Sequence, residues 1–132
     1  MIDVLFQTES HFSVDRKKVI AAITETLEKS MKGKIEVGVS IVGDRRMREL
    51  NRTYRQIDDT TDVLSFPLND PSDTKTATFV EPPDHVLRLG DIIISYPQAI
   101  LEAAEENKFV DDQIVFLAMH GLNHLLGIHH PE

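Results

Sequence analysis

The C-terminus of this chain concentrates side chains that can bind a metal ion. His120 and His124 are four residues apart, so on an α-helix their imidazoles lie on one face, about one turn apart. Gly127 predicts the end of that helix, because glycine readily takes the left-handed conformation found there. The chain can then turn back and deliver a third imidazole from His129 or His130. Three neutral nitrogens with a fourth position open are typical of a catalytic zinc site.

Two simpler explanations of these histidines were weighed. A single histidine pair at helical spacing arises by chance, and a histidine-rich C-terminus can be the remnant of a purification tag. Here the histidines alternate with Leu122, Leu125 and Leu126, which is unlike a tag. The chain has no cysteine, which excludes disulfides and thiolate ligands and leaves His, Asp and Glu. We therefore predict a metal site.

Zinc held by three histidines would lower the pKa of a bound water and polarise a phosphoryl or acyl oxygen. Zinc proteases with two helical histidines place a glutamate, the general base, directly after the first. That position is Gly121 here, so a peptidase would need another base, such as Asp91 or Glu132. Phosphodiester hydrolysis relies more on charge neutralisation, and Arg55 is a residue type that can grip a phosphate through two parallel hydrogen bonds.

Residues 45–55 predict a helix with an arginine stripe on one side and an apolar side opposite. The arginines fall within about 80° of one another: Arg45, Arg48, Arg52 and Arg55. The side predicted to be buried contains Met47, Leu50 and Tyr54. The stripe could contact phosphates or could be a solvated face paired to nearby acids. Arg55, at the helix end, is the arginine favoured for function.

Length and composition set outer limits on the protein class. At 132 residues, 41% of them hydrophobic, the chain predicts one globular domain over residues 1–132. A net charge of −8 argues against non-specific nucleic-acid binding unless a local basic patch exists. No apolar run approaches a membrane span, and the N-terminus does not resemble a secretory signal, so a cytoplasmic location is expected.

Hydrophobic periodicity predicts the elements in the order β-α-β-α-β-loop-β-α-α, an α+β fold with a small mixed sheet packed against helices. Predicted strands span residues 2–7, 34–42, 63–66 and 86–94. Predicted helices span residues 15–30, 45–55, 96–107 and from near 111 to the histidines. Residues 69–85 read as a surface loop with a partial hairpin at 76–80.

Several residues predict how these elements begin or bend. The expected N-caps are Ser13 or Asp15, Asp44, Ser95 and Asp111. Pro67 limits its strand or places it at a sheet edge, and Gly90 predicts a bulge or a close backbone approach.

Three sequence blocks together resemble the YbeY family, bacterial metal-dependent endoribonucleases implicated in ribosomal RNA maturation. The C-terminal segment is similar to the family signature His-Gly-x-Leu-His-Leu-x-Gly-Tyr-Asp-His, matching at His120, Gly121, His124, Leu125, Gly127 and His130. Residues 51–67 (NRTYRQIDDTTDVLSFP) resemble the central motif, and residues 89–95 (LGDIIIS) resemble the core strand. The blocks occur in family order, so the resemblance covers essentially the whole chain.

The resemblance implies an α+β fold with a zinc ion bound by His120, His124 and His130, and a functional Arg55. It also implies that metal-activated water cuts single-stranded RNA, a ribosomal RNA precursor, and that the protein associates with the ribosome or a ribosomal protein. Neither a membrane nor DNA is an expected partner. Asp62, Ser65 and Asp91 match recurring family positions, to which no individual chemistry is assigned.

The chain departs from the signature at three positions. Asn123 replaces Leu, Ile128 replaces Tyr, and His129 replaces the Asp before the third histidine. The last change removes a carboxylate that can orient a ligand, and leaves two adjacent candidate imidazoles. Alignment with the motif favours His130, with His129 as the alternative. Imidazole ligands suit Zn, Ni, Cu and Fe, so ligand type does not fix the metal.

The leading hypothesis is therefore a zinc-dependent, single-strand-specific endoribonuclease acting in ribosomal RNA maturation and ribosome quality control. A metallohydrolase of peptide or amide substrates is the second, and a carboxylate near the open metal position would favour it. The third is a non-catalytic, ribosome-associated module with a structural metal. It would need a fourth ligand, such as His85 or His11.

Overall fold

The computed structural model describes residues 1–68 and 85–127, and the elements follow the predicted order. The strands are β1 (Ile2–Thr8), β2 (Lys34–Val42), β3 (Val63–Pro67) and β4 (Val86–Ser95). The helices are α1 (Arg16–Ser30), α2 (Asp44–Arg55), α3 (Tyr96–Glu105) and α4 (Val110–Leu125). The predicted α+β class is confirmed. The hairpin predicted at 76–80 lies outside the described residues.

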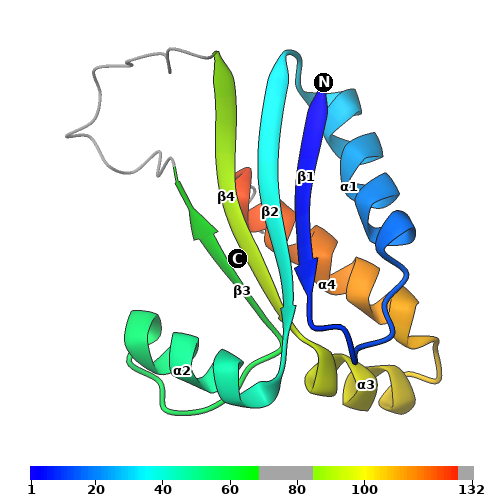
Figure 1. Cartoon of the computed structure of the whole chain (residues 1–132), viewed down its shortest axis with the longest axis vertical. Coiled ribbons are helices and arrows are strands. Elements are labelled where there is room, and N and C mark those ends of the chain that lie inside the picture. The colour runs from blue at the N-terminus through cyan, green and yellow to red at the C-terminus, as the bar shows by residue number, and fades with distance from the viewer. Residues whose placement is uncertain (69–84, 128–132) are drawn as a thin grey trace.

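The four strands form one mixed sheet in the order β1-β2-β4-β3 (Figure 1). β1 pairs in parallel with β2, and β2 in parallel with β4. β3 pairs antiparallel with β4 and forms one edge of the sheet, as Pro67 predicts. Ser65, which matches a recurring family position, therefore lies on the edge strand of the sheet.

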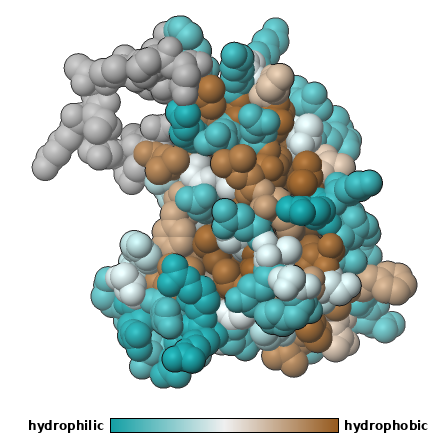
Figure 2. Space-filling view, in the orientation of Figure 1, coloured by the Kyte–Doolittle hydropathy of each residue, from teal (hydrophilic) through white to brown (hydrophobic). Residues whose placement is uncertain are grey.

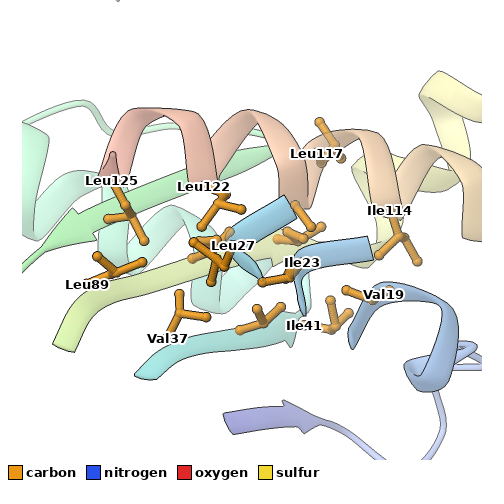
Figure 3. Close-up of a cluster of buried hydrophobic side chains, with 14 of the residues drawn as sticks. Val19, Ile23, Leu27, Val37, Ile41, Leu89, Ile114, Leu117, Leu122 and Leu125 are labelled. Atoms are coloured by element: carbon orange, nitrogen blue, oxygen red, sulfur yellow. The ribbon is translucent and has the colours of Figure 1, made fainter. Parts of the chain in front are cut away.

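One face of the sheet is covered by α1 and α4, and the main hydrophobic core lies between these helices and the sheet (Figure 3). Strict alternation in β2 sends Ile35, Val37, Val39 and Ile41 into this core, where all are buried. From α4, Ile114, Leu117, Leu122 and Leu125 point toward the sheet. Because burying each such side chain contributes about 1.5–3 kcal/mol, this layer fixes where α4 lies on the sheet.

The opposite face of the sheet has much less cover. Residues of α2 and of this face line a common hollow, and Met47 and Leu64 are buried outside the main core cluster. Figure 2 shows this face, with apolar surface exposed over the middle of the sheet and a hydrophilic surface over α2. The sheet therefore presents two different sides, one packed and one partly open.

Gly90 confirms the predicted bulge and close approach in β4. Its φ is +136°, and a Cβ atom there would lie 2.2 Å from the carbonyl oxygen of Phe66. The β2–β4 register shifts between Glu36 and Val37, on the strand that faces this bend. Only glycine meets both demands without strain.

The carboxylate of Asp44 joins three segments at the base of α2. The prediction that Asp44 is an N-cap is wrong, because the cap is Gly43 and Asp44 is the first helical residue. Instead, Asp44 Oδ1 accepts hydrogen bonds from Thr60 Oγ1 at 2.9 Å and Ser95 Oγ at 2.8 Å, and Gln98 Nε2 donates to both carboxylate oxygens at 3.3 Å. These bonds tie α2 to the loop before β3 and to the β4–α3 junction.

The other predicted caps have mixed outcomes. Asp15 caps α1 by accepting from the Lys18 amide, and Ser95 caps α3 by accepting from the Gln98 amide. Asp111 does not cap α4, because the cap position is Phe109 and the Asp111 side chain accepts from the Asp15 amide instead. Asp111 therefore connects two helices rather than starting one. None of the described helices is long and apolar enough to cross a membrane.

Asp44→Ala should lower the free energy of unfolding by about 1–3 kcal/mol, because the buried Ser95 hydroxyl loses its acceptor. Urea denaturation at neutral pH measures this. Asp3→Ala is the matched control, since Asp3 is exposed on β1. Equal midpoints for the two variants would show that the Asp44 contacts contribute nothing to stability.

Candidate functional site

Of the predicted site residues, Arg55, His120 and His124 line one cleft of about 450 Å³, here called the histidine cleft. Three elements line it. Arg55 comes from the last position of α2, residues 61–65 come from the loop and first part of β3, and α4 supplies His120, Gly121 and His124. The sequence alone did not establish that Arg55 and the histidine pair converge, and the fold brings them together.

The two α4 histidines lie side by side at the mouth of this cleft. Both are exposed, their ring centroids are 4.6 Å apart and their planes are tilted by 49°. Gly127 has a φ of +74°, and its amide donates to the His124 carbonyl, which confirms the predicted helix stop. His129 and His130 lie outside the described residues, so the third ligand stays a prediction.

The donor set fits a metal ion as far as it is described. Two exposed imidazoles one helical turn apart can share one ion, and the helix ends immediately after them. Within residues 1–68 and 85–127, no three His, Asp or Glu side chains are grouped to hold a metal. His11 and His85 are not among the described residues that line the cleft. The described residues therefore supply two of the three predicted ligands, and His130 stays a prediction.

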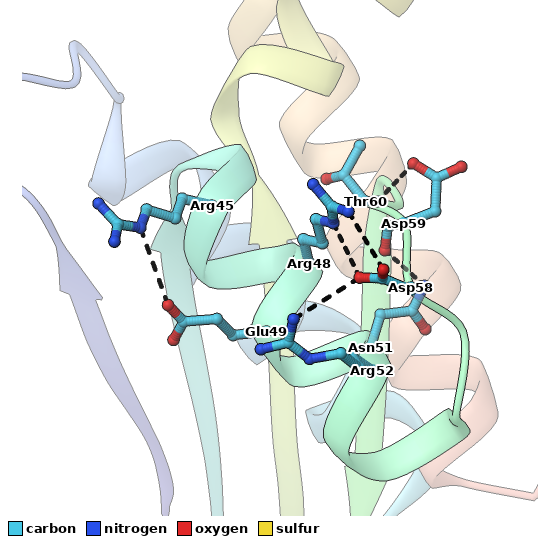
Figure 4. A network of polar contacts seen from close by, with 8 residues as sticks. All are labelled: Arg45, Arg48, Glu49, Asn51, Arg52, Asp58, Asp59 and Thr60. Carbon is cyan, nitrogen blue, oxygen red and sulfur yellow. Dashed lines mark hydrogen bonds and ion pairs between the residues drawn. The ribbon is translucent and has the colours of Figure 1, made fainter.

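Arg55 differs from the other arginines of the predicted stripe (Figure 4). Arg48 forms a two-point contact with Asp58 at 2.9 and 3.2 Å, and Arg52 lies 3.7 Å from the same carboxylate. The Arg48 contact lowers the pKa of Asp58. Arg45 lies 4.0 Å from Glu49. For these three arginines, the alternative of a face paired to nearby acids is the one observed.

No described ion pair involves Arg55, and its side chain is exposed at the cleft. A guanidinium that is not neutralised by a neighbouring acid can bind an incoming anion without first breaking a salt bridge.

The prediction of a buried apolar side of α2 is wrong at Tyr54. That ring is 62% exposed, whereas Asn51 is buried and donates to the Asp59 carbonyl.

A carboxyl cluster lies behind the wall of the histidine cleft. Asp62 lines the cleft, and its Oδ1 accepts from the Val63 amide at 2.7 Å. Glu102 of α3 accepts a hydrogen bond from Gln113 Nε2 of α4 at 2.7 Å. Burial, followed by the neighbouring Asp62 carboxyl, raises the pKa of Glu102 to about 7. The raised pKa therefore depends in part on a residue that lines the cleft.

Sequence reasoning missed Glu102 and Gln113. Asp62 matches a recurring family position, but Glu102 lies far from it in the chain, and Gln113, which donates to Glu102, lies further still. No local pattern singles them out, because each is an ordinary polar residue on an amphipathic helix. Only the packing of α3 against α4 reveals them.

Comparisons with known proteins identify the family of the chain. The sequence model of the family described as Endoribonuclease YbeY matches residues 4–132. The chain belongs to the YbeY family. It is 45% identical over 100 residues to an Endoribonuclease YbeY of Dehalococcoides mccartyi, covering 74% of this chain and 62% of that protein. It is 37% identical over 133 residues to the Roseiflexus castenholzii protein of the same name, covering 100% and 80%.

A solved structure supports the same fold. The solution structure of TM1509 from Thermotoga maritima aligns with a TM-score of 0.59 and 25% identity, covering 99% of this chain and 75% of that one. This chain spans about three-fifths of the length of the Dehalococcoides relatives that it matches. These comparisons establish the family for residues 4–132 and support the fold of the described residues.

The absence of a protease-type glutamate in this family member has a steric cause. Gly121 occupies that position and is buried, and a Cβ atom there would lie 2.7 Å from Ile92 Cγ2 and 3.2 Å from its Cγ1. Ile92 is fully buried in β4. Any side chain at position 121 would push α4 away from the sheet, so this site cannot use a base after the first histidine.

Gly121→Ala should destabilise the protein by about 1–2 kcal/mol. Overpacking against Ile92 costs about 1–3 kcal/mol, and the better helix propensity of alanine returns up to about 1 kcal/mol. Urea denaturation measures the change. Asn123→Ala on the same helix is the control, since it improves propensity without adding a contact at Ile92. A stabilised Gly121→Ala variant would contradict the close contact.

Glu102→Gln should flatten the pH dependence of stability between pH 4.5 and about 7. Because the folded protein raises the pKa of Glu102, its protonated form stabilises the fold below the ordinary pKa of 4.5, and this contribution is lost as pH rises through about 7. Urea denaturation at a series of pH values measures the slope. Glu105→Gln, at an exposed position, should keep the wild-type slope. An unchanged slope in Glu102→Gln would contradict the raised pKa.

Proposed function

We propose that this protein is a metal-dependent endoribonuclease that cuts single-stranded RNA during ribosomal RNA maturation. Membership of the YbeY family and the names of its relatives support the activity. The observation on which the proposal rests is the convergence of Arg55 with His120 and His124 in one cleft. A phosphate-binding cation beside paired metal ligands suits phosphodiester hydrolysis better than peptide hydrolysis.

His120, His124 and His130 are the proposed metal ligands, and zinc is the proposed ion. Bound there, zinc would supply a Lewis acid and an activated water. The helix already places the two α4 imidazoles side by side, with ring centroids 4.6 Å apart, which supports their binding to one ion.

Arg55 is proposed to bind the scissile phosphate. Its guanidinium can donate two parallel hydrogen bonds to the non-bridging oxygens, whose negative charge grows as the bond to the leaving oxygen breaks. The ion pairs of Arg48 and Arg52 with Asp58 leave Arg55 as the cation in the described lining of the cleft. Asp62 is the carboxylate of the same lining, so it is the group we assign to accept a proton during the reaction.

The partners follow from the same chemistry. A net charge of −8 disfavours general nucleic-acid binding, so selectivity for a precursor rRNA would come from the cleft and from ribosomal contacts. We propose ribosome association and a cytoplasmic location on these grounds, together with a role in ribosome quality control. The chain as given, residues 1–132, is proposed to act as one domain.

A metallohydrolase of amide substrates is the second candidate, because Asp62 does place a carboxylate in the cleft. Family membership and the steric need for Gly121 count against it. Hydrolysis of casein by the zinc-loaded protein, with no cleavage of RNA, would favour this candidate.

The test pairs metal analysis with cleavage of a single-stranded rRNA fragment. Wild type should contain one zinc ion per chain, and His124→Ala should lose both metal and cleavage. Arg55→Glu should keep its metal while kcat falls about 100- to 1000-fold, because a charge-stabilising donor has been replaced by an acid. Elemental analysis and gel-based kinetics give the two readouts.

Arg45→Glu provides the matched control, since Arg45 lies on the same helix and its side chain is 96% exposed outside the histidine cleft. It should cleave at close to the wild-type rate. If wild type binds zinc and cuts no RNA that the His124→Ala and Arg55→Glu variants leave intact, the nuclease proposal fails for this chain. The structural-metal hypothesis would then lead.

A further inference from the structure

A second, larger hollow lies on the partly open face of the sheet, here called the sheet-face cleft. It measures about 550 Å³, within the range usual for small-molecule sites. It is lined by the end of β1, by β2, by β4 and by one side of α2. Neither His120 nor His124 is among the described residues that line it. The leading function assigns it no task.

An exposed aromatic pair forms one wall of this cleft. Tyr54 of α2 and Phe66 of β3 meet edge to face, with ring centroids 5.0 Å apart and planes at 60°. Tyr54 is 62% exposed, so its ring is open to solvent beside the hollow. Aromatic rings that are held in place but open to solvent are the platforms on which single-stranded nucleic acids stack their bases.

The two clefts adjoin across the edge of the sheet. The consecutive residues Tyr54 and Arg55 line the sheet-face cleft and the histidine cleft, respectively. On β3, Ser65 lines the histidine cleft and Phe66 lines the sheet-face cleft, because successive side chains of a strand point to opposite faces. A chain bound at Arg55 therefore needs to pass only over edge strand β3 to reach Tyr54.

The floor of the sheet-face cleft has polar groups suited to base edges. The Asp91 carboxylate lies over Gly38, where a Cβ atom would be 2.2 Å from Asp91 Oδ1. Gln7 and Ser40 lie in the same lining and can donate or accept hydrogen bonds. A carboxylate repels phosphate but accepts hydrogen bonds from the amino groups of bases. Arg46, at the α2 side of the cleft, lies 3.4 Å from Glu49, and Glu9 is a second acid of the lining, so this cleft suits a base rather than a phosphate.

We propose that the sheet-face cleft binds a nucleotide flanking the scissile phosphate of single-stranded RNA, with its base stacked on the exposed ring of Tyr54, which Phe66 supports edge to face. This rests on the proposed nuclease function and names the part of the substrate that the second cleft recognises. The backbone crosses β3 between Arg55 and the aromatic pair, and the base edge faces Asp91. Tyr54 thereby serves substrate binding rather than the chemical step. A duplex cannot present an unstacked base, so this contact selects single strands.

The chain offers a direct optical test, because it has no tryptophan and only two tyrosines, Tyr54 and Tyr96. In a Tyr96→Phe background, titration of the zinc-loaded protein with single-stranded oligoadenylate should quench the Tyr54 fluorescence. Fluorescence anisotropy of labelled RNA should show roughly ten- to hundredfold weaker binding by Tyr54→Ala, the usual loss for one stacked base. Tyr54→Phe should bind like wild type, because the ring is retained.

The kinetic signature separates this role from that of the histidine cleft. Tyr54→Ala should raise KM for a long single strand with little change in kcat, whereas Arg55→Glu lowers kcat. Phe109→Ala is the control, because that ring is 81% exposed and precedes His120 by about 16 Å of α4. An oligomer that lacks bases should bind wild type and Tyr54→Ala equally.

Unchanged fluorescence and equal RNA affinity in wild type and Tyr54→Ala would overturn the proposal and leave this face to a protein partner. Equal weakening of the base-free oligomer would overturn it too, since the contact would then not be stacking. Failure of the proposed nuclease function would give a different result from failure of the proposed stacking site. In that case, RNA would bind through Tyr54 without being cut.

Discussion

The close approach of α4 to β4 sets the geometry of the whole candidate site. Gly121 brings the helix backbone onto Ile92, a distance at which even a methyl group would collide. The histidines one residue before and three residues after this contact are therefore presented at a fixed height above the sheet. The apolar residues of α4 hold the helix in place, and glycine fixes how near it comes. A family signature that reads as metal chemistry is thus also a packing requirement.

The position of α2, on the other side of the histidine cleft, depends on hydrogen bonds and ion pairs rather than on apolar packing. The Asp44 carboxylate gathers hydrogen bonds from the loop before β3 and from the β4–α3 junction, which orients α2 against the sheet. Asp58 then neutralises Arg48 and Arg52 along the exposed side of the same helix. In an acidic chain, these pairs confine the available positive charge to the helix end, where the cleft lies. The acids around α2 therefore contribute to where an anion can bind.

Much of the fold was predictable because its signals are local. The alternation in residues 34–42 fixes β2, the helical spacing of buried residues fixes α1 and α4, and Gly90 and Gly127 mark a bulge and a helix stop. The histidine pair and Arg55 could also be selected, although their meeting in one cleft required the fold. The predictions that Asp44 caps α2 and that Tyr54 is buried were both wrong for one reason. Both depend on which way α2 is rolled and on partners distant in sequence, and helical periodicity does not report either.

The bulge at Gly90 has a consequence beyond its own strand. Through it, β4 meets the Phe66 carbonyl so closely that β3 is held to a single pairing register. A slip of one residue would turn Ser65 and Phe66 to the opposite faces and exchange what each cleft is lined with. Glycine at this one position in the middle of the sheet therefore helps to set the register of an edge strand whose two sides line different clefts.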